Sequence, residues 1–416
     1  DMGGALTHAL RYRAVLNYAD IEGYRRTNDR RMAGYLALAY DIDERQALEF
    51  RGGFNRDKYG TDIGLAPVMS ADIYNADGSL YLKKGESLPG LDRRARYNNE
   101  SDLFRNSGAN ASLRYRYVGS ESFRLNEAFT FTYDMNDYFS TEPLTYLTSS
   151  SPIYKHYFDR TVGGKTTRTY ISLDSLELSG PLKFGNRAYL YHNQLEANGR
   201  FRFGRGMKYE YLAGYSFVGY MRNAFSSTRA PRNDRFNNTY GVYGPGLYSV
   251  IDAHDPHSMG YIATRIKTAT PAQLFVHALY LQNILELSDH FKVMLAGRYD
   301  YVRYQRTLKS MPVTDDSWSF KRTEPYTPVD NSAFTYRAGL VYLQLSIYGS
   351  YANFFQPFRE YYSPKLIYVN SEGKRFDAEH TAQIFKPQTG DQAELGMKYT
   401  HGDLFYVSGA VYHINR

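Results

Sequence analysis

Arginine and tyrosine residues are concentrated in the segment 218–271, and together they suit the capture of a bulky anion. The segment holds six Arg or Lys residues against three Asp residues, a net charge of +3. The planar guanidinium matches carboxylate or catecholate oxygens, and Tyr offers rigid amphipathic area at a low entropic cost. We therefore predict a binding surface for an anionic chelate, formed by Tyr220, Arg222, Arg229, Arg232, Arg235, Tyr240, Tyr243 and Tyr248. The alternative is a basic loop that touches anionic lipopolysaccharide.

A second cluster in the same segment has the residue types of a metal site. The run Asp252-Ala253-His254-Asp255-Pro256-His257 places two His and two Asp within six residues. Such ligands suit zinc or iron. However, Asp-Pro also initiates turns, and His is common in loops. We predict neither a metal site nor a bound cofactor.

Motifs of covalent catalysis lack the residues that they need. Gly164-Lys165-Thr166 resembles the end of a phosphate-binding loop, but Asp159 stands where the first glycine would be and would repel phosphate. No Gly-x-Ser-x-Gly turn is present, and the absence of Cys excludes a thiolate nucleophile. We predict that the protein is not an enzyme.

The composition narrows the class of protein. The 416 residues include 42 Tyr but one Trp, and aromatic residues reach 16%. The net charge of +7 is a small excess for this length, which argues against a dedicated nucleic-acid-binding protein. No run of 18 apolar residues exists, so transmembrane helices are excluded. Transmembrane β-strands are not excluded, because their alternating faces average out as polar.

Alternation with a period of two dominates the chain and predicts strands. Leu10, Tyr12 and Ala14 share one face, while Arg11 and Arg13 share the other. A hairpin is predicted between the alternating runs 195–203 and 207–217. Its turn, Gly204-Arg205-Gly206, supplies the positive φ that a tight hairpin needs.

Connection lengths separate a membrane barrel from a soluble sandwich. Short turns are predicted near 41–43, 119–122, 204–206, 287–290 and 401–403. Long polar segments lie near 55–107, 134–187, 218–271, 303–332 and 355–390. Short turns alternating with long loops are typical of outer-membrane barrels and rare in compact soluble domains. We predict an all-β, antiparallel up-and-down transmembrane β-barrel, with Tyr40, Tyr117, Tyr133, Tyr299, Tyr301 and Tyr304 in its interfacial aromatic girdles.

Three stretches carry a family resemblance. The first runs from Tyr280-Leu281-Gln282-Asn283 through a turn to Gly297-Arg298-Tyr299-Asp300. The second runs from Tyr336-Arg337-Ala338-Gly339 to Phe355-Gln356-Pro357. The third, Pro387-Gln388-Thr389-Gly390 to Gly396-Met397-Lys398-Tyr399, leads to Ala410-Val411-Tyr412. In order and spacing they resemble the barrel of TonB-dependent outer-membrane transporters, most closely the siderophore-receptor branch, with Asn283 where that pattern usually has Asp.

The resemblance implies energy-coupled import of a ferric siderophore by an integral protein of the bacterial outer membrane. It implies a barrel of about 22 strands closed by a plug. About thirteen strands are predicted in residues 1–416, all in one barrel domain. The plug, its TonB contact and the last strands are expected to lie outside this sequence. The implied partners are the chelate, outer-membrane lipid and, through the plug, the TonB complex, with no nucleic acid.

Two alternative functions stay open at this point. The first is import of haem, cobalamin or an oligosaccharide by a receptor of the same superfamily. A haem receptor would need an axial His, for which His254 and His257 are the candidates. The second is a porin without a plug, which would conduct ions without energy coupling.

Overall fold

The computed structural model describes residues 1–25, 27–62, 64–97, 103–140, 143–178, 182–229, 249–255, 265–306, 309–310, 321–322, 328–342, 347–356, 368–369, 375–376, 388–401 and 405–415. These residues are almost entirely β-strand, with a single 3-10 turn, η1 (Gly204–Gly206). No helix among them is long and apolar enough to cross a membrane.

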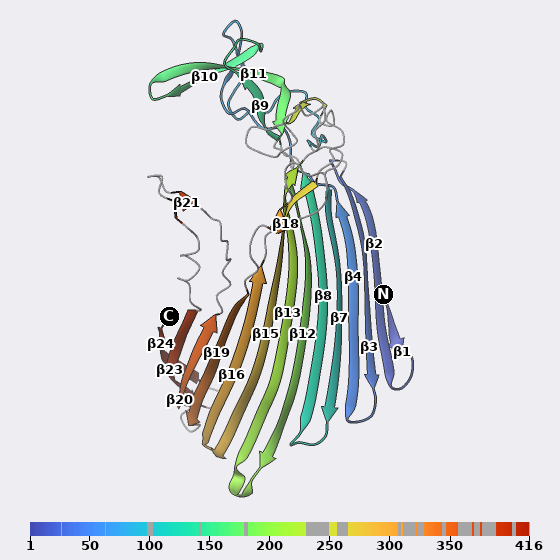
Figure 1. Cartoon of the computed structure of the whole chain (residues 1–416), viewed down its shortest axis with the longest axis vertical. Coiled ribbons are helices and arrows are strands. Elements are labelled where there is room, and N and C mark those ends of the chain that lie inside the picture. Colours follow the sequence, from blue (N-terminus) through green and yellow to red (C-terminus); the bar gives the residue numbers. More distant parts are fainter. Residues whose placement is uncertain are drawn as a thin grey trace.

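One large antiparallel sheet holds most of the strands, and each strand pairs with the next strand of the sheet (Figure 1). Its order is β1 (Met2–Ala5), β2 (Leu10–Glu22), β3 (Asn28–Asp41), β4 (Gln46–Tyr59), β7 (Leu103–Val118), β8 (Arg124–Ser140), β12 (Leu182–Arg202), β13 (Lys208–Arg229), β15 (Arg265–Ser288), β16 (Phe291–Arg306), β19 (Val329–Tyr342), β20 (Ile347–Gln356), β23 (Gln388–His401) and β24 (Phe405–Asn415). The short strands β17 (Lys309–Ser310) and β18 (Lys321–Arg322) extend it beside β15. The sequence predicts about thirteen strands. The additional strand is β1, whose residues resemble a turn but pair with β2.

The connections confirm the predicted alternation of short and long. Short turns join β3 to β4, β7 to β8, β12 to β13 and β15 to β16 at one end of the sheet (Figure 1). The β12–β13 turn contains Gly206 at a φ of 83°, a backbone region that a side chain disfavours. Long connections after β4, β8 and β13 leave from the opposite end, which we call the mouth.

The register gives the sheet one apolar and one polar face. On the apolar face, large side chains stay exposed, including Leu16 at 75%, Leu395 at 63% and Val411 at 78%. So large an apolar surface is unfavourable in water and fits a lipid environment. Tyr299 and Tyr301 lie on this face as predicted. Tyr304 does not, because it pairs with Leu274, which pairs with Tyr220 on the polar face.

The polar face is lined by hydrogen-bonded charges. At the turn end, the Glu286 carboxylate bridges three strands by accepting from Lys208 Nζ at 2.9 Å and Lys292 Nζ at 2.5 Å. Farther up, the Tyr280 hydroxyl donates to Glu196 at 2.7 Å. These bonds satisfy the charges within the wall, as expected for the interior of a barrel.

The long connections build a second, smaller sheet, which we call the cap. Its order is β14 (Ser249–Asp252), β11 (Lys165–Leu178), β10 (His156–Val162), β5 (Ile73–Asn75) and β6 (Leu80–Leu82), with β9 (Pro143–Ser149) also paired to β11. The cap lies beyond the mouth of the large sheet (Figure 1). The sequence predicts loops here, so this sheet is the main departure from that prediction. A separate two-stranded ribbon joins β21 (Tyr368–Val369) to β22 (Arg375–Phe376).

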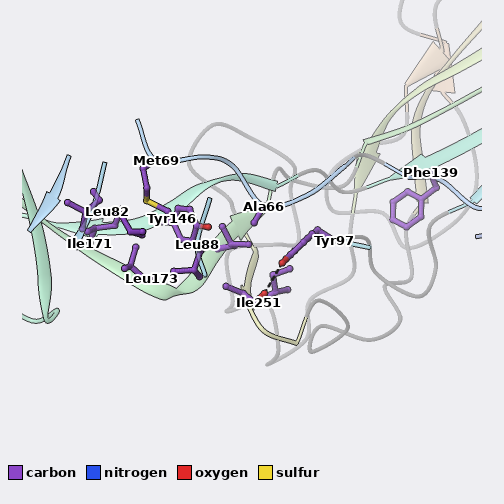
Figure 2. Packing of buried hydrophobic residues seen from close by; sticks show 13 residues of the cluster. Ala66, Met69, Leu82, Leu88, Tyr97, Phe139, Tyr146, Ile171, Leu173 and Ile251 are labelled. Carbon is purple, nitrogen blue, oxygen red and sulfur yellow. Dashed lines mark hydrogen bonds between the residues drawn. The ribbon is translucent and has the colours of Figure 1, made fainter. Parts of the chain in front are cut away.

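A hydrophobic core holds the cap together (Figure 2). It draws residues from all three long connections, among them Met69, Ile73, Leu82, Leu88, Tyr97, Tyr146, Ile171, Leu173, Leu176, Ile251 and Ala253. Leu176 has no exposed area, and Ile251, its direct partner across β11 and β14, has 2%. The three connections therefore fold as one unit, since none of them could bury these side chains alone.

Candidate ligand-binding site at the barrel mouth

A row of aromatic rings crosses four neighbouring strands on the polar face at the mouth. Tyr59, Phe104, Tyr138 and Phe184 are direct cross-strand partners on β4, β7, β8 and β12. Ring centroids lie 5.8 Å apart for the first pair, 6.1 Å for the second and 4.6 Å for the third. Phe184 is 41% exposed. We call this row the aromatic row; its rigid apolar surface suits stacking with a ligand.

A row of amides lies directly below it on the same face. Asn106, Asn136 and Asn186 are cross-strand partners on β7, β8 and β12. The Oδ1 atom of Asn106 is buried and makes no hydrogen bond among the described residues. Amide side chains both donate and accept, so this row can bind the polar edge of a ligand that stacks above it.

Charged groups flank the amide row on both sides. On one side, Arg31 Nε donates to Asp57 Oδ1 at 2.9 Å, and Asn55 donates to the other oxygen of that carboxylate at 2.9 Å. On the other side, Arg222 Nε donates to Asn186 Oδ1 at 2.7 Å. Arg222 is exposed and uses one of its five donors in this bond, so its outer fork is available to an anion.

The structure places two of the eight predicted binding residues on this face. Tyr220 and Arg222 lie on β13, pointing to the same side as the amide row. Arg229 ends β13, where its backbone pairs with Arg265. The remaining predicted residues, Arg232, Arg235, Tyr240, Tyr243 and Tyr248, lie outside the described residues. Whether they bind a ligand stays a prediction.

The Asp/His cluster forms a turn at the end of β14. The backbone amide of His254 donates to Asp252 Oδ1 at 2.8 Å, and its ring Nε2 lies 3.9 Å from Asp174 Oδ1. Among the described residues, no group of three or more potential metal ligands comes together. His257 lies outside the described residues.

Sequence reasoning misses the aromatic row and the amide row. Each member lies at the end of a strand and looks like an ordinary Tyr, Phe or Asn of a β-strand. The rows exist only through register, which brings together residues up to 125 positions apart, from Tyr59 to Phe184. The one available signal was the recurrence of an aromatic residue two positions from an Asn or Asp, as in Asn136 and Tyr138.

Two tyrosines in the cap core give a prediction of opposite sign. The Tyr97 hydroxyl donates to the Ala253 carbonyl at 2.9 Å, whereas the Tyr146 hydroxyl is buried without a partner among the described residues. Tyr97→Phe should destabilise the cap by about 1–2 kcal/mol, because a buried acceptor loses its donor. Tyr146→Phe should stabilise it by about 1 kcal/mol, because an unpaired hydroxyl is removed. Hydrogen exchange of cap peptides measures both.

The same pair predicts how cap stability depends on pH. Burial raises the pKa of Tyr146 to about 12 and raises the pKa of Tyr97 as well. Below pH 10 both states are protonated; above it the unfolded chain loses protons first, so stability falls between about pH 10 and 12. Tyr146→Phe should make that fall shallower. A fall of equal slope in the variant and the parent would contradict this assignment.

The alternating strands, the turn pattern and the charged polar face define a transmembrane β-barrel of the bacterial outer-membrane type. The family model "TonB dependent receptor-like, beta-barrel" matches residues 34–416. The chain therefore belongs to the TonB-dependent receptor family. No curated protein matches the chain.

Solved structures with the same fold are siderophore receptors by their titles. The ferric-catecholate import receptor Fiu of E. coli K12 matches with a TM-score of 0.59 at 14% identity, over 100% of this chain and 55% of its own. The siderophore receptor PiuA of Acinetobacter baumannii matches with 0.54 at 14%, over 99% and 54%. FpvA of P. aeruginosa, bound to a ferric pyoverdine, matches with 0.54 at 15%, over 99% and 45%. The chain thus spans about half the length of these structures.

Proposed function

We propose that this chain is the barrel part of a receptor that imports a ferric siderophore across the outer membrane of a bacterium. The observation that carries the proposal is the aromatic row above the amide row on the polar face at the mouth. In this proposal the polar face lines the lumen, the mouth faces the outside, and the short turns face the periplasm.

The mouth has the chemistry for a chelate rather than for catalysis. Stacking on Phe184 and Tyr138 would hold the planar parts of the chelate, while the fork of Arg222 and the free Asn106 oxygen would bind its polar groups. Ferric iron is the cargo here and is carried within the chelate. No bond has to be made or broken by the protein.

Passage through the lumen requires energy coupling in this proposal. The titles of the structural neighbours name import of ferric chelates, and the family name refers to TonB. We infer that a plug closes the lumen and that the TonB complex acts on the plug. The charged polar face, with groups such as Arg114 and Glu210, offers ion-pair partners for such a plug.

Uptake of radioactive iron in cells that carry the complete gene tests this function. The arms are a ferric catecholate, a ferric hydroxamate, ferric citrate and haem, each with and without a protonophore. We expect saturable uptake of one ferric siderophore that the protonophore abolishes. Uptake of haem alone, or stable open conductance of the complete receptor in planar bilayers without energy coupling, would contradict the proposal.

A further inference from the structure

A row of charges crosses five neighbouring strands on the apolar face, just below the mouth. Its members are direct cross-strand partners on β2, β3, β4, β7 and β8, in the order Asp20, Arg30, Lys58, Arg105 and Asp137. The signs run minus, plus, plus, plus, minus. The row is invisible in the sequence, because its members lie up to 117 positions apart.

The two outer pairs are closed and the centre is open. Arg30 donates to Asp20 at 2.9 Å, and Arg105 donates to Asp137 at 3.1 Å. Lys58 stands between the two arginines, and Arg56 follows on the same face of β4. Both are exposed, and neither has an ion-pair partner among the described residues. With these four cations and two anions, the cluster has a net charge of +2.

Three cations side by side are unfavourable without an anion. Like charges directly opposite each other destabilise a sheet, and both neighbours of Lys58 carry its own sign. The two aspartates lie two strands away from Lys58, on the far sides of the arginines. An external anion placed over Lys58 and Arg56 would remove this repulsion and would use the outer donors of both arginines.

The cluster lies at the edge of the apolar surface. On β4, Phe54 comes directly before Arg56 on the same face and is 43% exposed, and on β3, Met32 occupies the same level as Arg56 with 48% exposed. Arg56 lies about ten residues beyond the turn that precedes β4, roughly the length of strand that crosses a bilayer. The cations are therefore at the depth of lipid headgroups.

We infer that Arg56 and Lys58, flanked by Arg30 and Arg105, bind the phosphate of an anionic outer-leaflet glycolipid whose acyl chains lie on Phe54 and Met32. This inference rests on the outer-membrane placement in the proposed function. A lipid is the occupant because the cations and the apolar surface are continuous on one face. A soluble anion would have no use for the apolar part.

The test uses the complete receptor in detergent and native mass spectrometry with bisphosphoryl lipid A. The variant is Arg56→Gln with Lys58→Gln. The control is Arg187→Gln with Arg303→Gln, two cations on the apolar face of β12 and β16. Arg187 lies over the Phe225 ring at 5.8 Å, and Arg303 lies 3.8 Å from Asp330. The control has the same change in charge and leaves the cluster intact.

We expect the variant to bind lipid A at least about tenfold more weakly, a loss of about 1.4 kcal/mol, while the control stays within about twofold of the parent. Dephosphorylated lipid A should bind the parent as weakly as lipid A binds the variant. Equal loss in variant and control would overturn the site. Displacement of lipid A by millimolar inorganic phosphate would overturn the assignment to a lipid. Binding of the ferric chelate, measured on the same variants, should not change, so failure of this inference is distinct from failure of the import function.

Discussion

Replacing Tyr138 and Phe184 with alanine should weaken binding of the ferric chelate by several hundredfold. The two rings form the closest pair of the aromatic row, with centroids 4.6 Å apart, and both project from the polar face at the mouth. Central aromatic contacts in a binding site contribute about 2 kcal/mol each, or about thirtyfold per ring. Isothermal titration of the complete receptor with the chelate measures the loss.

The same two strands supply a matched control. Tyr133 and Tyr189 are also direct partners on β8 and β12, with ring centroids 5.0 Å apart, but they lie on the apolar face. Tyr133→Ala with Tyr189→Ala removes similar aromatic area from the lipid side and should leave chelate affinity within about twofold. If both double variants lose affinity equally, the aromatic row acts only by supporting the strands and is not a binding surface.

Replacing Ile251 with alanine should unfold the cap while the large sheet stays intact. Ile251 is 2% exposed and pairs with Leu176 in the core that joins the three long connections. A cavity of this kind costs about 2–5 kcal/mol, which is a large part of the stability of a small unit. Limited proteolysis should cut the cap of the variant rapidly and leave the barrel band unchanged.

The neighbouring residue gives the comparison for this variant. Val250 lies on the opposite face of β14 and is 49% exposed, so Val250→Ala should change stability by no more than about 0.5 kcal/mol. Equal protection of the cap in the Ile251 and Val250 variants would show that the core does not hold the three connections together. Loss of the barrel band in the Ile251 variant would show that cap and barrel unfold as one.

The strands and their faces are predictable from the sequence for a simple physical reason. A strand repeats every two residues, so alternation such as Leu10, Arg11, Tyr12, Arg13 fixes both the element and the face of each side chain. Turn residues such as Gly204 and Gly206 mark where the chain reverses. The antiparallel order then follows, because short turns join only neighbouring strands.

The cap and the aromatic row are not predictable in this way. Residues such as Met69, Leu88 and Leu173 stand singly in polar segments, and no short window shows that they share a core. The aromatic row depends on register between β4, β7, β8 and β12, to which a single sequence gives no access. The prediction from the sequence therefore concentrates on segment 218–271, and only Tyr220 and Arg222 are placed beside the amide row.

The position of the iron in a complex of the complete receptor with its chelate tests the central claim most directly. Crystals of the complex, measured at the iron absorption edge, give an anomalous peak that marks the metal. We predict one peak on the lumen side at the mouth, above Tyr138 and Phe184 and within reach of Arg222. A peak only on the outer surface of the cap, or deep at the turn end beside Glu286, would contradict binding at the mouth.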